Sequence, residues 1–114
     1  MALRKDEPAE MELEAAIDLR PWQLQEVRRM LAEILPGVVA WAYGSRVKGT
    51  ARRTSDLDLV VFVEPGDARV EAFREELEES DLPFVVDVHV WHDLPAEWRA
   101  GIERDKFVVM SLHG

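Results

Sequence analysis

Two aspartates stand at the start of an apolar segment in the middle of the chain. Asp56 and Asp58 are two positions apart, and the residues that follow them up to Val63 are mostly Val and Leu. Side chains alternate between the two faces of a β-strand, so this spacing predicts that both carboxylates lie on one face. Acids at a strand end can simply blunt the edge of a sheet. A shared hard cation is the other explanation, and oxygen ligands select Mg²⁺ or Mn²⁺.

A third carboxylate interrupts a later apolar segment, residues 84–91. This carboxylate is Asp87, and His89 shares its face of the expected strand. If this strand pairs beside the strand that carries Asp56 and Asp58, the three carboxylates converge. Such a cluster is suited to two-metal phosphoryl or nucleotidyl displacement. A histidine on a sheet is more often structural, so the role of His89 is left open.

A glycine–serine turn precedes the first acids. Gly44 and Ser45 follow a short apolar run, and a glycine turn that opens a helix can offer backbone N–H groups to a phosphate. Ser45 can also serve as the N-cap of that helix, and the two roles are compatible. A group of basic residues lies between this turn and the acids: Arg46, Lys48, Arg52 and Arg53. In an acidic chain, a basic loop beside three acids indicates contact with a triphosphate or an acidic partner, and Arg46 is the leading candidate.

The elements that must position these residues follow from hydrophobic spacing and from turn signals. Helices are expected from Pro21 to the Pro36-Gly37 stop, from Asp67 to about Asp81, and from near Pro95. Strands are expected over residues 38–43, 57–63, 84–91 and 107–112, the last at an edge. The pattern predicts an α/β (α+β) fold with a small mixed β-sheet flanked by helices. Residues 1–18 are expected to form a partly flexible arm, and residues 19–114 a single domain.

Composition narrows the classes of function. With 114 residues, 47% hydrophobic and 32% charged, the chain fits one globular domain. The absence of Cys excludes a disulfide scaffold, a thiolate nucleophile and Cys-ligated metals. No segment resembles a signal peptide or a membrane span, which predicts a cytoplasmic protein with no membrane partner. A net charge of −9 disfavours general nucleic-acid binding.

The segment from Gly44 to Leu59 resembles a known family. It fits the pattern GSxxxGxxxxxSDxDL at every fixed position. This pattern is the signature of the minimal nucleotidyltransferases in the DNA polymerase β-like superfamily. The family's third carboxylate stands alone on a later apolar strand, as Asp87 does here. The resemblance extends over about Leu24 to Met110 and implies the polymerase β-like nucleotidyltransferase fold.

The resemblance also implies roles for individual residues. Gly44 and Ser45 would hold the β- and γ-phosphates of a nucleoside triphosphate, and Asp56 and Asp58 would hold Mg²⁺ against it. Asp87 would complete the second metal site and help to deprotonate an acceptor hydroxyl. The expected reaction transfers a nucleoside monophosphate, most often AMP from ATP, and releases pyrophosphate. We count Arg46 and Lys48 of the basic loop with the phosphate-binding residues.

Members of this size are commonly paired with a helical HEPN-type protein as the antitoxin of a toxin–antitoxin pair, and some add AMP to a tyrosine of that partner. Others neutralise by binding, so the competing hypothesis is a non-catalytic antitoxin-like subunit. A third hypothesis is transfer onto a small molecule such as an aminoglycoside, although those enzymes usually carry an additional domain. The acceptor, the base preference and the oligomeric state are left open by the sequence.

Overall fold

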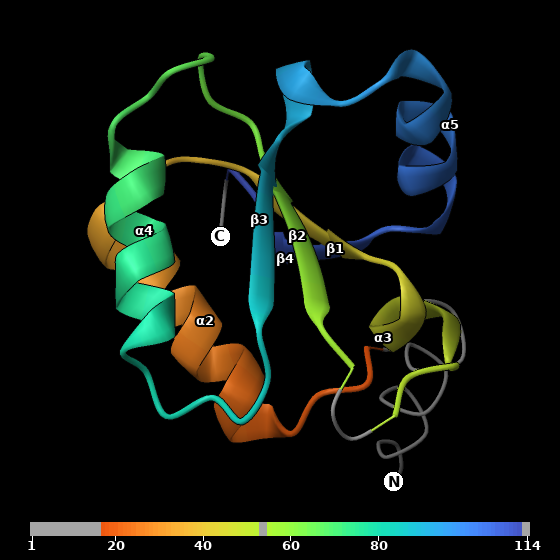
Figure 1. Ribbon diagram of the computed structural model, residues 1–114, viewed down its shortest axis with the longest axis horizontal. Helices are drawn as coiled ribbons and strands as arrows, with labels where there is room; N and C mark the ends of the chain where they lie inside the picture. The colour runs from red at the N-terminus through yellow and green to blue at the C-terminus, as the bar shows by residue number, and fades with distance from the viewer. Residues whose placement is uncertain (1–16, 53–54, 113–114) are drawn as a thin grey trace, which may run out of the picture.

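A four-stranded β-sheet forms the centre of the computed structural model, which describes residues 17–52 and 55–112 (Figure 1). The strands are β1 (Ala40–Tyr43), β2 (Leu57–Val61), β3 (Val86–Val90) and β4 (Phe107–Met110), in the order β3-β2-β1-β4. β1 is antiparallel to both β2 and β4, while β2 and β3 are parallel. The expected mixed sheet is therefore confirmed, with β4 at an edge. The first sixteen residues of the expected arm lie outside the described residues.

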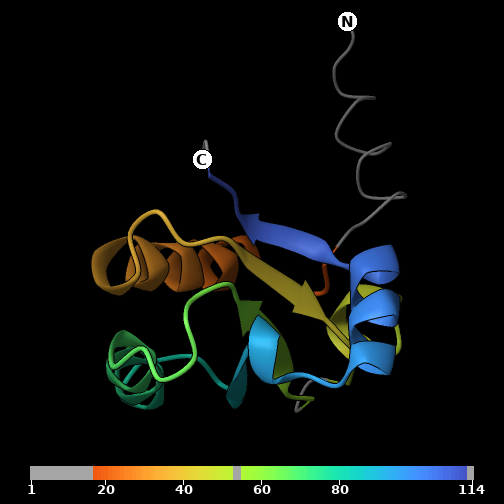
Figure 2. The same cartoon turned by 90° about the horizontal axis from the view of Figure 1, so that it is seen from above.

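Two helices cover one face of the sheet, α2 (Pro21–Ile34) and α4 (Arg69–Glu78) (Figure 2). Their buried side chains, such as Leu31 and Phe73, share one apolar core with Leu57 and Leu59 of β2. α4 connects β2 to β3, and a parallel pair of strands needs a crossover connection of this kind. This crossover places the Asp58 strand and the Asp87 strand side by side with the same direction.

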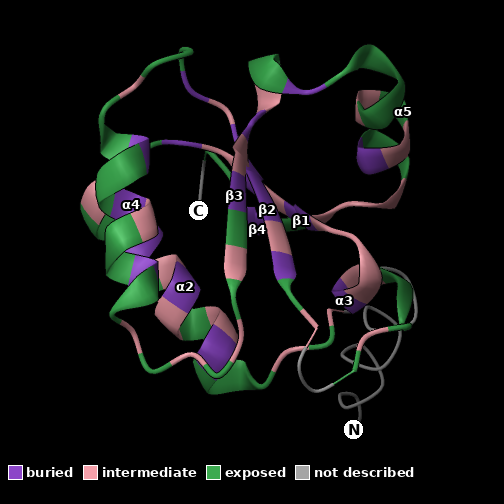
Figure 3. Cartoon of the chain, in the orientation of Figure 1, coloured by how far each residue is buried: buried purple, intermediate pink, exposed green. Residues whose placement is uncertain are grey.

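The other face of the sheet carries α5 (Ala96–Asp105) and a 3₁₀ turn, η1 (Trp91–Asp93). A smaller apolar cluster forms here around Val60 and Ile102, with Trp41 and Trp91 packed against it. The rings of Trp41 and Trp91 meet edge to face, with their centroids 5.5 Å apart. Part of β3 on this face stays exposed (Figure 3). α3 (Ser45–Lys48) follows the end of β1, and its Val47 packs against the main core.

The observed elements follow the predicted order, with shorter strands. β1 begins at Ala40 and β3 at Val86, each two residues later than expected. Two of the four tryptophans are largely uncovered, since Trp22 is 47% exposed and Trp98 is 51% exposed. Those two rings lie on helix surfaces, where the sheet does not cover them. In the part of the chain that the structure describes, no helix is long and apolar enough to cross a membrane.

Candidate active site

Three polar side chains form a row across the sheet. Asp58 on β2 is paired with Tyr43 on β1 and with Asp87 on β3. Strand alternation turns Leu57 and Leu59 into the main core, so Asp58 between them points to the opposite face. The predicted pairing of the two acidic strands is thus confirmed, and it places Asp58 and Asp87 directly opposite each other.

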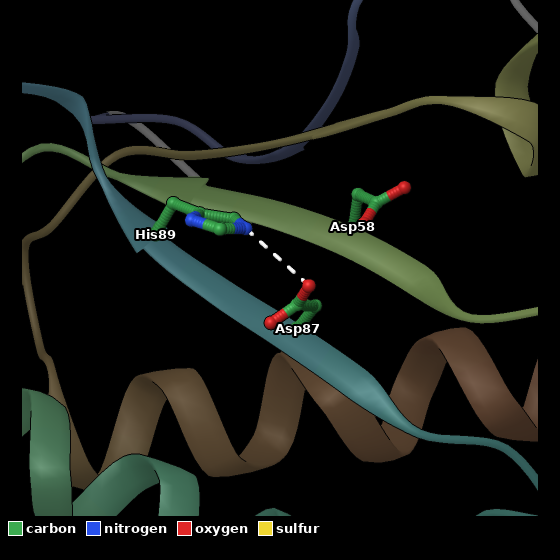
Figure 4. A group of neighbouring side chains, drawn as sticks. All are labelled: Asp58, Asp87 and His89. Atoms are coloured by element: carbon green, nitrogen blue, oxygen red, sulfur yellow. Dashed lines mark ion pairs between the residues drawn. The ribbon is translucent and has the colours of Figure 1, made fainter. Parts of the chain in front are cut away.

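His89 joins the two acids on this face (Figure 4). It lies two residues after Asp87 on the same strand, and its Nε2 is 3.5 Å from the Asp87 carboxylate. One ligand atom from each of Asp58, Asp87 and His89 lies within 4.8 Å of the others. We call these three residues the acidic triad. Two carboxylates and an imidazole are a donor set that fits a divalent cation.

The electrostatics of the triad reflect the closeness of its acids. Burial raises the pKa of Asp58, Asp87 raises it further, His89 lowers it, and Asp56 adds a smaller upward effect. Burial raises the pKa of Tyr43 to about 12, and the negative charges of Asp58 and Asp87 contribute to that rise. Both shifts come first from burial and then from the neighbouring carboxylates, so a cation at this site would favour the ionised form of Asp58.

Asp56 lies at the entry to β2, as the sequence predicts. β2 begins at Leu57, so Asp56 lies just before the strand and is exposed. It is near enough to raise the pKa of Asp58, but it lies outside the triad. The third place is taken by His89, whose role the sequence left open. Its spacing of two from Asp87 was the available signal, since that spacing places both on one face.

Gly44 brings the backbone against the acids. Its φ of 89° and ψ of −156° fall in a region that is essentially restricted to glycine. A methyl group built on its Cα would overlap the Asp58 carboxylate. Ser45 follows at once as the first residue of α3, and its carbonyl accepts a hydrogen bond from Thr50 N at 3.1 Å. The predicted turn therefore touches the predicted metal ligand.

The contacts of Arg46 favour a structural role. Its side chain is buried, and its guanidinium donates to the carbonyls of Asp18 at 2.8 Å, Ser55 at 3.1 Å and Arg52 at 3.4 Å. It also stacks on the Phe84 ring, 4.2 Å from the centroid. These contacts tie the loop before β2 to the segment before α2. The expectation that Arg46 is the leading phosphate ligand receives no support from this arrangement.

Lys48 lies beside the site instead. It is exposed and lines a groove of about 250 Å³ together with Tyr43 and Gly44. The opposite wall comes from α5 and includes Trp98 and Ile102. Of the other basic-loop residues, Arg52 is exposed and Arg53 lies outside the described residues. Among the described basic residues of this loop, Lys48 is the one that lines the groove beside Gly44.

Comparison with known proteins gives three findings. Residues 24–111 match the model of the nucleotidyltransferase domain family. The chain is 39% identical over 100 residues to a probable protein adenylyltransferase, MntA, from Haemophilus influenzae. The matched region covers 85% of this chain and 86% of the relative. A solved structure of a toxin–antitoxin with AMP-PNP shares the fold, with a TM-score of 0.64 and 18% identity, over 77% of this chain and 73% of that one.

Proposed function

This chain belongs to the nucleotidyltransferase domain family and is a nucleotidyltransferase, and we propose that it transfers AMP from ATP to a hydroxyl of a partner protein. The observation that carries the proposal is the register of the two acidic strands. It sets Asp58 directly opposite Asp87 and places Gly44 against Asp58. The site thus combines paired carboxylates, which can hold a cation, with a close backbone turn, which can receive phosphates.

We assign the cation to Asp58 and Asp87, with Asp56 near the same site. The donor oxygens and the excess negative charge fit Mg²⁺ or Mn²⁺. When bound, the cation neutralises charge on the triphosphate and polarises the phosphoryl group that is transferred. Gly44 and Ser45 form the turn that would receive the β- and γ-phosphates. Lys48 would add a positive charge from the wall of the groove.

The reaction forms one bond and breaks one. The acceptor oxygen bonds to the α-phosphorus of ATP, the bond from that phosphorus to the bridging oxygen breaks, and pyrophosphate leaves. The hydroxyl proton needs an acceptor, and we assign Asp87 to this role because its side chain is 55% exposed. A carboxylate that accessible can be reached by a hydroxyl from another molecule. Most of the remaining work is positioning and charge stabilisation.

A protein acceptor is favoured by the relative from Haemophilus influenzae, whose name describes protein adenylylation. The resemblance found in the sequence implies a helical HEPN-type partner with a tyrosine hydroxyl as the acceptor. The acidic outer face of α4 offers a surface for a basic partner, since Glu71, Glu75 and Glu78 are all exposed there. The competing function is that of a binding subunit that restrains the partner without modifying it.

Labelled ATP separates these functions. The chain is co-purified with its partner from its own cells and incubated with Mg²⁺ and ATP labelled at either the α- or the γ-phosphate. We expect label from the α-position to stay on the partner and label from the γ-position to leave. Intact mass of the partner should rise by one AMP, and the Asp58→Asn variant should give no increase. An unmodified partner that remains bound would support the binding subunit and overturn transfer.

A further inference from the structure

The imidazole of His89 lies beside the two carboxylates of the triad, where it could bind a cation. His89 is on β3 and faces the same side as Asp58 and Asp87, with its side chain 34% exposed. Asp87, Asp58 and Tyr43 lie near it, and the Tyr43 ring centroid is 6.3 Å from that of the imidazole. The imidazole thus lies near two carboxylates and a phenol.

The spacing of the donor atoms suits a single ion. Ligand atoms around one octahedral cation at about 2.1 Å are roughly 3 to 4 Å apart. The Asp87 oxygen and His89 Nε2 are separated by 3.5 Å, and all three triad atoms lie within 4.8 Å of one another. Small side-chain rotations are therefore enough to bring the imidazole nitrogen and both carboxylates onto one ion.

We propose that His89 is a direct ligand of the cation and that it shifts the preference of the site from Mg²⁺ toward Mn²⁺. The inference rests on the proposed function, because it names the cation of that same site. Mg²⁺ is a hard ion that favours oxygen, whereas transition-metal ions gain affinity from an imidazole nitrogen. With oxygen donors alone, the site would gain no preference for Mn²⁺ from its ligands, and the ion bound would depend on which ion is available.

A purely structural role for His89 makes a different prediction. If the imidazole only holds the Asp87 carboxylate by the 3.5 Å contact, its removal weakens every cation by a similar factor. If it is a ligand, its removal weakens Mn²⁺ much more than Mg²⁺. The ratio of the two affinities therefore distinguishes a ligand from a positioning residue, and it requires no measurement of catalysis.

The test measures free Mn²⁺ by electron paramagnetic resonance during titration of the full chain, and Mg²⁺ by competition. We expect His89→Ala to weaken Mn²⁺ about tenfold or more and Mg²⁺ by less than about threefold. His89→Gln keeps a hydrogen-bond donor for Asp87 and replaces the nitrogen ligand by an oxygen, so it should also lose the Mn²⁺ preference. His92→Ala is the matched control, since His92 is exposed in η1 and lies outside the triad.

The outcomes separate this inference from the proposed function. Equal weakening of both ions in His89→Ala, or no weakening of either, overturns ligation by His89. If ligation by His89 is overturned in this way but Asp58→Asn still abolishes cation binding, the metal site of the proposed function stands. If Asp58→Asn binds both cations as the parent does, the metal site itself is refuted. Circular dichroism of each variant shows that the compared chains are folded.

Discussion

Gly44 and Asp58 are in contact across the β1 and β2 strand ends, and the fit leaves no room for a side chain on Gly44. A methyl group at that position would overlap the Asp58 carboxylate, and the backbone there has a positive φ of 89°. The residue that opens the proposed phosphate turn therefore also limits where Asp58, a proposed metal ligand, can lie. This contact makes the turn and the acidic triad a single unit.

Gly44→Ala should lower the affinity for Mn²⁺ by about tenfold or more, because Asp58 must move away from the added methyl group. The strained backbone should also cost about 1 to 3 kcal/mol of stability. Gly49→Ala is the matched control: Gly49 also has a positive φ, 80°, but no atom lies within 4 Å of its added methyl group. Titration with Mn²⁺ and thermal melting test both variants. Unchanged Mn²⁺ affinity in Gly44→Ala would contradict the contact.

Asp58→Asn should melt at a slightly higher temperature than the parent in metal-free buffer near neutral pH. The pKa of Asp58 is raised in the folded chain by burial and by Asp87, so folding favours its protonated form. Asp58 therefore contributes its full stabilisation of the folded parent below the pKa it has in the unfolded chain. That contribution is lost as the pH rises through its higher folded-state pKa. The advantage of the variant should therefore disappear in acid. Melting curves at a series of pH values in EDTA test this.

Added Mg²⁺ or Mn²⁺ should reverse that order. A cation that binds only the folded parent raises its melting temperature and should have little effect on Asp58→Asn. Equal responses of the two proteins to either ion would show that Asp58 is not a ligand.

Tyr43 should resist ionisation in the folded chain. It is the only tyrosine, so tyrosinate absorbance reports on it alone. Its pKa is raised to about 12, first by burial and then by Asp58 and Asp87. At about pH 10.5 the Tyr43 phenol should remain largely protonated in the folded chain, while in denaturant it should be mostly ionised. Asp58→Asn should lower the pKa of Tyr43 only part of the way to its ordinary value, because the effect of burial remains. A folded-state titration near pH 10 would contradict the placement of Tyr43 against the acids.

Arg46→Ala should destabilise the chain by about 3 kcal/mol, because it leaves the carbonyls of Asp18, Ser55 and Arg52 without their charged donor. Arg52→Ala is the control, since it keeps the backbone carbonyl that Arg46 contacts and removes an exposed side chain. Denaturant unfolding measures the loss. ATP binding by the fraction that stays folded should be nearly unchanged. A stable Arg46→Ala variant that binds ATP poorly would restore the original expectation of a phosphate ligand.

Local sequence patterns determined which segments become strands and which of their residues face away from the core. The alternation of Leu57, Asp58 and Leu59 allows one burial pattern in a sheet, and Asp87 follows the same rule on β3. The spacing of Gly44 and Ser45 before the acids likewise predicted a turn near the site. These features depend on neighbouring residues alone, so they could be predicted without the structure.

The tertiary structure decided the features that depend on contacts between distant segments. β2 and β3 are joined by the α4 crossover, and their register, set by packing of the whole sheet, places Asp58 opposite Asp87. Arg46 looked like a phosphate ligand from charge alone, yet it is buried against the Asp18 carbonyl of a distant segment and the Ser55 carbonyl of its own loop, and hydrogen bonding offsets the cost of burying its charge. Asp56 lies just before β2 and outside the triad. His89 lies within it because strand pairing brings the imidazole to the acids.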